Sequence, residues 1–185
     1  MKSLRAISTH ITWFMMEFED LSQEEKHLLE IARNARQNAQ APYSSNFLVG
    51  AAVLTEKTKS VYGGCNVERV TLSQTTHAEQ NAIDSMVRWE GPVKISKLAF
   101  VLGPGNVSIS MPPHRSKEQI YKFNKITVPC GQCLQCIWEN CHGDDRVQIF
   151  SVLPNGLISR ITIGDAFPLR FGPANLGIDY SKTAI

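Results

Sequence analysis

Three stretches of the chain show the hydrophobic spacing of amphipathic helices. Ser22 and Glu25 form a capping box, and apolar residues recur behind it at helical spacing, which predicts a helix over residues 23–39. The same spacing predicts a second helix over residues 77–89, which Gly-Pro ends. A third helix is predicted over residues 130–141.

Five short apolar segments are typical of strands, and three of them lie between these helices while two follow the last helix. They cover residues 47–54, 61–65, 98–102, 147–152 and 157–163. A turn sequence, Leu-Pro-Asn-Gly at 153–156, joins the last two. A parallel pair needs a crossover of about a dozen residues, so these two strands must be antiparallel if they pair. We therefore expect an α/β fold, a three-layer α/β/α sandwich with a mixed five-stranded sheet and an antiparallel final pair.

Length and composition are those of one globular domain. The chain has 185 residues, of which 43% are hydrophobic and 19% charged, and this composition excludes a disordered protein. A net charge of +2 gives no support for DNA wrapping or membrane-surface binding, and no apolar run is long enough to span a membrane. We assign residues 1–21 to an N-terminal extension, residues 22–178 to the domain, and residues 179–185 to a tail.

Two parts of the chain are not predicted to belong to the core. Residues 103–127 form a long loop that carries Arg115, Lys117, Lys122 and Lys125, and loops of this length are usually functional or disordered. The first sixteen residues are basic and contain no acid. We expect a cytoplasmic protein, and the basic start leaves a mitochondrial leader open.

A histidine, a glutamate and a Cys-x-x-C pair are the residues that carry candidate chemistry. Cys130 and Cys133, at a helix start after Pro129, have the spacing that grips one zinc ion. His77 can supply a third ligand, which leaves a fourth position for water, as in catalytic zinc sites. Glu79 can then shuttle protons, provided that His77 and Glu79 sit at a helix mouth. The pattern matches the H-x-E…P-C-x-x-C signature of zinc deaminases.

The remaining thiols allow a different reading of the same region. Cys136 and Cys141 could complete a closed four-thiolate structural zinc site with the first two cysteines. Closing that site would break the helix and leave His77 and Glu79 unused. We therefore interpret Cys136 and Cys141 as small buried hydrophobic residues.

Several motifs together resemble the cytidine deaminase family, in the family's order, from about residue 22 to 176. They are Ala41-Pro42-Tyr43-Ser44, Phe47 with Val49-Gly50-Ala51, Gly64-Cys65-Asn66-Val67-Glu68, His77-Ala78-Glu79-Gln80, Pro129-Cys130-Gly131-Gln132-Cys133 and Phe171-Gly172-Pro173. The resemblance implies hydrolytic conversion of cytidine or deoxycytidine to the uracil nucleoside and ammonia in pyrimidine salvage. A zinc-bound hydroxide would attack C4 of the base.

The resemblance also implies roles residue by residue. His77, Cys130 and Cys133 match the ligands of one zinc ion per chain, and Glu79 matches the catalytic proton shuttle. The residues that match substrate-binding positions are Asn66 and Glu68 at the ribose 3′-hydroxyl, Phe47 beside the pyrimidine, Ala78 with its backbone at the base, and Phe171 reaching a neighbouring subunit's site. A homo-oligomer with shared active sites, dimer or tetramer, is therefore expected.

The charge at the sugar narrows the substrate. Glu68 is an uncompensated anion that would repel a 3′-phosphate, which favours a free nucleoside over a nucleic acid. Two alternatives stay open at this point. One is a deaminase of single-stranded nucleic acid or of a nucleoside antibiotic, supported by the basic residues at 115–125. The other is a non-catalytic, zinc-stabilised binding domain.

Overall fold

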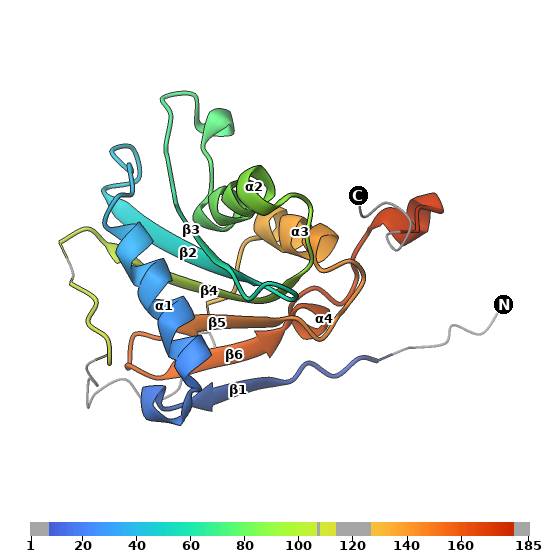
Figure 1. Ribbon diagram of the computed structural model, residues 1–185. Coiled ribbons are helices and arrows are strands. Elements are labelled where there is room, and N and C mark those ends of the chain that lie inside the picture. The colour runs from blue at the N-terminus through green and yellow to red at the C-terminus, as the bar shows by residue number, and fades with distance from the viewer. Residues whose placement is uncertain (1–7, 107, 114–126, 180–185) are drawn as a thin grey trace, which may run out of the picture.

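A mixed six-stranded sheet forms the centre of the fold in the computed structural model, which describes residues 8–106, 108–113 and 127–179 (Figure 1). The strand order is β1-β6-β5-β4-β2-β3. The strands are β1 (Trp13–Met16), β2 (Phe47–Thr55), β3 (Val61–Cys65), β4 (Ile95–Pro104), β5 (Gln148–Val152) and β6 (Ile158–Thr162). Strands β4 and β5 pair in parallel, and the other neighbours pair antiparallel. The expected α/β class is confirmed.

The antiparallel pairing of the last two strands is also confirmed. Residues 148–152 of β5 pair with residues 158–162 of β6 in antiparallel register. Gly156 has a φ of +83° in the connection, a backbone conformation that glycine adopts without steric cost. The side chain of Asn155 accepts a hydrogen bond from the backbone N–H of Leu157 at 3.2 Å. The turn residues therefore set the direction of β6.

The sheet has one strand more than the five that we predicted. β1 pairs with β6 at the edge of the sheet, with Trp13 opposite Ile161. Phe18 and Leu21, which also fall within the predicted N-terminal extension, are buried in the core. The Trp-Phe-Met-Met run of β1 lacks the polar and apolar alternation of a strand. It forms a strand because it pairs with β6, which lies about 145 residues later in the chain.

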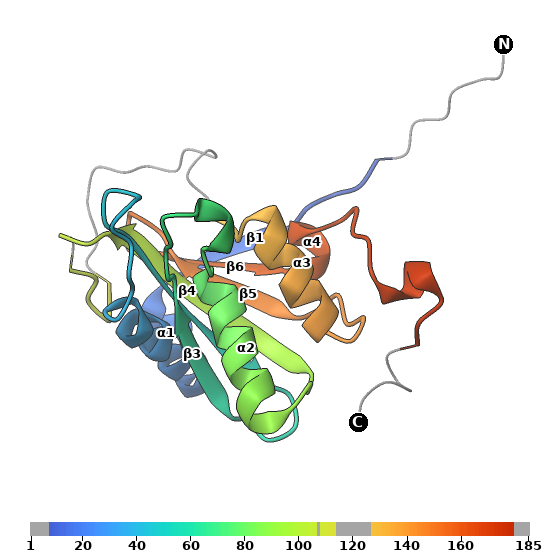
Figure 2. The ribbon, with the colours of Figure 1, turned by 90° about the horizontal axis from the view of Figure 1, so that it is seen from above.

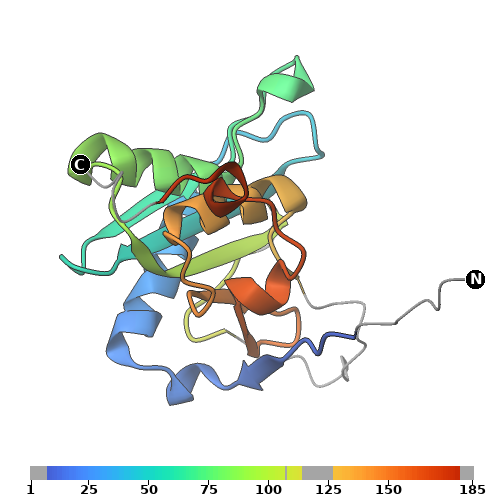
Figure 3. The same cartoon turned by 90° about the vertical axis from the view of Figure 1, so that its right-hand side faces the viewer.

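Helices cover both faces of the sheet and complete the three layers (Figures 2 and 3). Helix α1 (Gln23–Arg36) covers one face, while α2 (Ala78–Glu90) and α3 (Gly131–Asn140) cover the other. A short helix α4 (Ile163–Ala166) follows β6. The capping box at the start of α1 is present as predicted, although the helix ends at Arg36, three residues early. None of the described helices is long and apolar enough to cross a membrane.

Close backbone contacts fix two of the helices against β2 and β3. A Cβ atom on Gly64 would lie 2.2 Å from the backbone nitrogen of Ala82 in α2, and one on Gly50 would lie 2.0 Å from the carbonyl oxygen of Ala32 in α1. Only glycine permits such an approach. Gly64 therefore sets how closely α2, which follows directly on His77, packs on the sheet.

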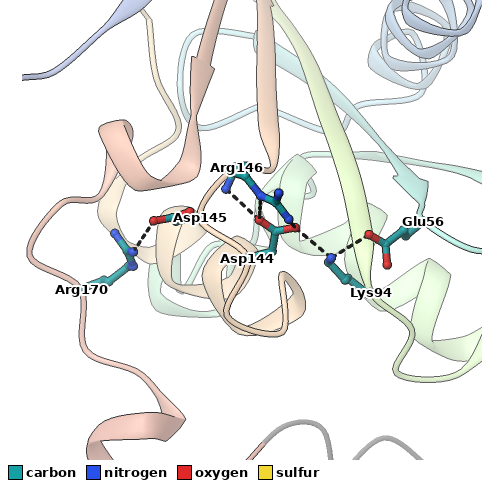
Figure 4. Close-up of polar contacts among 6 residues, drawn as sticks. All are labelled: Glu56, Lys94, Asp144, Asp145, Arg146 and Arg170. Atoms are coloured by element: carbon teal, nitrogen blue, oxygen red, sulfur yellow. Dashed lines mark hydrogen bonds and ion pairs between the residues drawn. The ribbon is translucent and has the colours of Figure 1, made fainter.

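An ion-pair network ties together three connections at one end of the sheet (Figure 4). The Lys94 ammonium lies 2.7 Å from Glu56 and 2.9 Å from Asp144, and Asp144 also pairs with Arg146 at 2.9 Å. Hydrogen bonds from Arg146 and Lys94 hold the pKa of the Asp144 carboxyl well below its usual range. Beside it, Asp145 pairs with Arg170 at 3.5 Å. The network links the β2–β3 turn, the start of β4 and the segment after α3.

The predicted loop at 103–127 is described only in part. Residues 103 and 104 belong to the end of β4, and the basic residues at 115–125 lie outside the described residues. The tail predicted for residues 179–185 also lies outside them, apart from Asp179.

Candidate functional site

Two helix N-termini meet at the site, and each contributes its N-cap residue. His77 is the N-cap of α2 and Cys130 is the N-cap of α3, with extended backbone at both positions. Side chains at such positions project past the end of the helix, which is the helix-mouth geometry that His77 and Glu79 require.

The three predicted ligands lie together. The Nδ1 atom of His77 is 3.4 Å from Sγ of Cys130 and 3.3 Å from Sγ of Cys133. All three ligand atoms fall within 4.8 Å of one another. A tetrahedral zinc ion with Zn–N of about 2.0 Å and Zn–S of about 2.3 Å separates these ligands by about 3.5 Å. The residues therefore fit a three-ligand zinc site with a fourth, open position.

The environment of Cys133 also fits a cation at this point. Cys133 is buried, and burial raises the pKa of its thiol far above the usual range, with the neighbouring Glu79 and Cys130 raising it further. A thiol in that position becomes a thiolate only when a positive charge lies beside it. Zinc, which binds thiolate and imidazole, supplies that charge.

Cys136 on α3 and Cys141 at the C-terminal end of α3 are not part of this cluster. Among the described residues, the metal-competent group consists of His77, Cys130 and Cys133 alone. Cys141 is fully buried, and burial raises the pKa of its thiol to about 12. Cys136 is half-buried, and its thiol pKa is also raised by burial. Both behave as packing residues, so the closed four-thiolate reading is wrong.

Glu79 lies on the first turn of α2 and is buried, with 6% of its surface exposed. It lines the same cavity as His77 and Cys130. Its carboxylate also helps to raise the pKa of the Cys133 thiol, which indicates that it lies near the ligand cluster. An acid at this position can exchange protons with a group that enters the cavity.

The cavity has a volume of about 290 Å³ and is lined by groups that could bind a small molecule. His77, Cys130 and Glu79 line it together with Asn66 and Glu68. Phe47 and Ala78, both predicted as site residues, line it as well. Sequence reasoning missed the further lining residues Ser44, Val49, Thr75, Phe100, Leu102 and Val128.

Glu68 is held in place by donors from the loop before β2. Its Oε2 atom accepts hydrogen bonds from the backbone N–H groups of Tyr43 at 2.7 Å and Ser44 at 3.1 Å. A hydrogen bond from the Ser44 hydroxyl and these two backbone bonds lower the pKa of the Glu68 carboxyl below its ordinary value. Glu68 is thus a fixed anion. The Pro-Tyr-Ser sequence before β2 could have identified Ser44 as a residue of the site.

Asn66 connects the site to strand β2. Its Oδ1 atom accepts a hydrogen bond from the backbone N–H of Val49 at 2.8 Å, and its Nδ2 atom donates one to the carbonyl oxygen of Phe47 at 3.0 Å. These bonds fix both the Asn66 amide and the start of β2. Phe47 itself is 40% exposed beside the cavity.

Phe171 is the one predicted substrate-binding residue that does not line the cavity. It is 58% exposed and belongs to the C-terminal segment that extends away from the sheet (Figures 1 and 2). The carbonyl oxygen of Phe171 accepts a hydrogen bond from the Gln135 side chain at 3.0 Å, and Gly172 packs against Trp138. This segment is therefore anchored to α3.

Sequence comparison identifies relatives over most of the chain. Residues 22–150 match the family model for the cytidine and deoxycytidylate deaminase zinc-binding region. A cytidine deaminase of Sporosarcina psychrophila is 32% identical over 150 residues, which are 80% of this chain and 92% of that protein. A cytidine deaminase of Halalkalibacterium halodurans is 30% identical over 144 residues, 78% of this chain and 91% of that protein.

Solved structures with the same fold include two cytidine deaminases. The enzyme from Burkholderia pseudomallei aligns with a TM-score of 0.58 and 26% identity over 82% of this chain and all of that one. The enzyme from Mycobacterium tuberculosis aligns with a TM-score of 0.58 and 26% identity over 82% of this chain and 99% of that one.

Proposed function

Because the chain belongs to the cytidine deaminase family, with zinc as its cofactor, we propose that it hydrolyses free cytidine and deoxycytidine to the uracil nucleosides and ammonia. One observation carries this proposal: the ligand cluster, a buried acid and an anionic sugar-binding group share a single cavity of about 290 Å³. Ligand pockets of small molecules start at about this size.

His77, Cys130 and Cys133 hold the zinc ion. When bound, the ion acts as a Lewis acid that lowers the pKa of water to about 7 and so supplies a nucleophile at neutral pH. The protein's part is to leave one side of the metal facing the cavity and to keep the ligands rigid. The N-cap positions of His77 and Cys130 on two packed helices supply that rigidity.

Glu79 moves the protons. A carboxylate beside the nucleophile would accept a proton from the water and give it to N3 of the pyrimidine, then take the second proton from the hydroxyl added at C4 and deliver it to the departing amine as the C4–N bond breaks and the C4 carbonyl forms. Its burial at 6% exposure excludes bulk water from these transfers. The backbone of Ala78, 1% exposed at the start of α2, meets the base.

Glu68 and Asn66 recognise the sugar. A carboxylate can accept about four hydrogen bonds, and Glu68 accepts three from Tyr43 and Ser44, so it can take another from the 3′-hydroxyl. The same fixed anion repels a 3′-phosphate. The antiparallel β5–β6 pair also supports a free nucleoside, because the nucleotide and nucleic-acid deaminases resemble one another in a parallel final pair. Phe47 packs beside the pyrimidine.

Phe171 serves the active site of a neighbouring subunit, so the enzyme is a homo-oligomer, a dimer or tetramer. Its exposure and its distance from the chain's own cavity support this assignment. Five free cysteines, two of them zinc ligands, support a reducing compartment, which is the cytoplasm for an enzyme of pyrimidine salvage.

The test is an ultraviolet assay of purified protein with cytidine, deoxycytidine and deoxycytidine monophosphate, alongside zinc analysis. We expect turnover of one or both nucleosides, little turnover of the nucleotide, and about one zinc ion per chain. Faster turnover of the nucleotide or of an oligonucleotide would overturn the substrate assignment. A fully zinc-loaded protein without ammonia release would favour the non-catalytic alternative.

A further inference from the structure

A second cavity lies beside the C-terminal end of α1, which covers the sheet face opposite to α2 and α3. Its volume is about 400 Å³. Arg33, Arg36 and Gln37 line it from the helix, and Asn106 and Ser108 line it from the segment after β4. No acidic residue is among the described residues of its wall. The cavity is therefore rich in hydrogen-bond donors and positively charged.

Arg36 is a buried cation that pairs with none of the acidic residues that the structure describes. It is 5% exposed. Its Nε atom donates to the carbonyl oxygen of Leu48 at 3.2 Å, and its Nη2 atom donates to the carbonyl oxygens of Gly103 at 2.9 Å and Pro104 at 2.7 Å. Burial lowers the pKa of the Arg36 guanidinium, yet an arginine stays charged in proteins. Carbonyl groups satisfy its N–H donors but do not neutralise its charge.

Arg33 lies one turn earlier on the same face of α1 and has an unused donor. Its Nη2 atom donates to the side chain of Asn34 at 2.7 Å. Its Nε atom is buried without a hydrogen-bond partner, and no other described side-chain nitrogen or oxygen shares that state. Within the described parts of the chain, neither Arg33 nor Arg36 forms an ion pair. Two like charges thus face one cavity at i, i+3 spacing.

The negative end of the α1 dipole can balance only part of the positive charge of Arg33 and Arg36. The C-terminal end of a helix carries about half a negative charge, whereas the two guanidiniums carry two positive ones. A buried charge is costly unless it is paired. An oxyanion in the cavity would supply the missing negative charge and accept from the Nε atom of Arg33. Arginine is suited to phosphate because its planar fork donates two parallel hydrogen bonds.

We propose that this cavity is a binding site for a phosphate group, either free or carried on a small organic molecule. Arg33 and Arg36 neutralise the phosphate, and Gln37, Asn106 and Ser108 offer further polar contacts. Leu48 and Ile109 provide an apolar wall for the rest of an organic phosphate, and about 400 Å³ is ample for one. The site is separate from the zinc cluster and does not depend on the deaminase activity.

Calorimetric titration of the zinc-loaded protein tests this proposal with ribose 5-phosphate, ribose and inorganic phosphate, each at fixed ionic strength. Each titration is repeated with saturating uridine, the expected product, which occupies the deaminase cavity, so that binding which persists belongs to the second cavity. We expect saturable binding of both phosphates and none of ribose. Tighter binding of ribose 5-phosphate than of phosphate identifies an organic ligand, and equal binding identifies the free anion.

Two variants locate the site. Arg33→Gln removes one charge, and the side-chain hydrogen bond that it breaks is to the adjacent Asn34, so the fold should persist. We expect it to weaken phosphate binding at least about tenfold. Arg88→Gln removes the same charge from the exposed end of α2 and should change binding less than about twofold. The proposal fails if neither phosphate binds saturably, if ribose binds as well as its phosphate, or if both variants weaken binding equally.

Discussion

The Nδ1 atom of His77 lies 3.3 Å from Sγ of Cys133, although the two residues are 56 positions apart in the chain. The contact exists because α2 and α3 pack side by side on one face of the sheet with their N-termini at the same end. Sheet register and helix packing thus set the geometry of the zinc ligands. Perturbing the packing should therefore affect the metal site as much as removing a ligand does.

Loss of a single thiolate should empty the metal site. In Cys130→Ser the exposed sulfur becomes a hydroxyl, which binds zinc poorly, and no buried group is lost. We expect the zinc content to fall from about one equivalent per chain to below about half. Cys136→Ser makes the same change on the same helix outside the ligand cluster and should keep its zinc. Elemental analysis that finds one full equivalent in Cys130→Ser would refute the ligand assignment.

Ser44 should act as a positioning residue for Glu68. Ser44→Ala removes the hydroxyl that, together with two backbone N–H groups, lowers the pKa of the Glu68 carboxyl and holds the carboxylate in place. We expect KM for cytidine to rise about tenfold with kcat little changed, because the chemistry lies at the other part of the cavity.

Two neighbouring changes check this effect. Ser44→Thr keeps the hydroxyl and should restore KM, and Ser45→Ala removes an adjacent hydroxyl that is not among the donors to Glu68. Steady-state kinetics in which Ser44→Ala lowers kcat and leaves KM unchanged would contradict the sugar-binding role.

Gly64→Ala should displace α2. The new Cβ atom would lie 2.2 Å from the backbone nitrogen of Ala82 and 2.7 Å from the carbonyl oxygen of Ala78, and backbone atoms cannot rotate away. We expect a loss of about 3 kcal/mol in the free energy of unfolding, measured in urea. Gly131 is the first residue of α3, and a Cβ atom there would have no neighbouring atom within 4 Å. Gly131→Ala therefore serves as the control. Equal stability of the two variants would show that the helix tolerates a wider spacing.

Asp144→Asn should destabilise the protein in a pH-dependent way. The pKa of Asp144 is lower in the folded protein than in the unfolded chain, so its ion pairs with Arg146 and Lys94 contribute fully above the unfolded pKa of about 4. Their contribution disappears as the pH falls from there towards the folded pKa. We expect Asp144→Asn to cost about 1–2 kcal/mol at pH 7, and the difference from wild type to narrow below pH 4.

The adjacent aspartate gives a matched comparison. Asp145 is more exposed and pairs with Arg170 at 3.5 Å, so Asp145→Asn should cost less than about 1 kcal/mol at pH 7. Denaturant unfolding at several pH values measures both variants. An Asp144→Asn protein as stable as Asp145→Asn at pH 7 would show that the network does not stabilise the fold.

Local sequence predicted the features that depend on local chemistry. The capping box at Ser22, the helix starts near His77 and Cys130, and the antiparallel turn at 153–156 were predicted, because each is fixed by a few adjacent residues, whereas the helix-mouth geometry of His77 and Glu79 was only assumed. Strand β1 was missed because an edge strand is defined by its distant partner β6. The hydrogen bond from Ser44 to Glu68 was missed for a similar reason. The two residues are 24 positions apart in the sequence, and a contact between loops leaves no periodic pattern in it.

The proton-transfer role of Glu79 is the central claim, and the rate of cytidine deamination by Glu79→Gln tests it most directly. The amide has nearly the same shape as the carboxyl but cannot carry a proton between the nucleophile and the base. With zinc content and unfolding temperature equal to wild type, we predict a rate at least about a hundredfold lower. A zinc-loaded Glu79→Gln protein that keeps more than about a tenth of the wild-type rate would contradict the account.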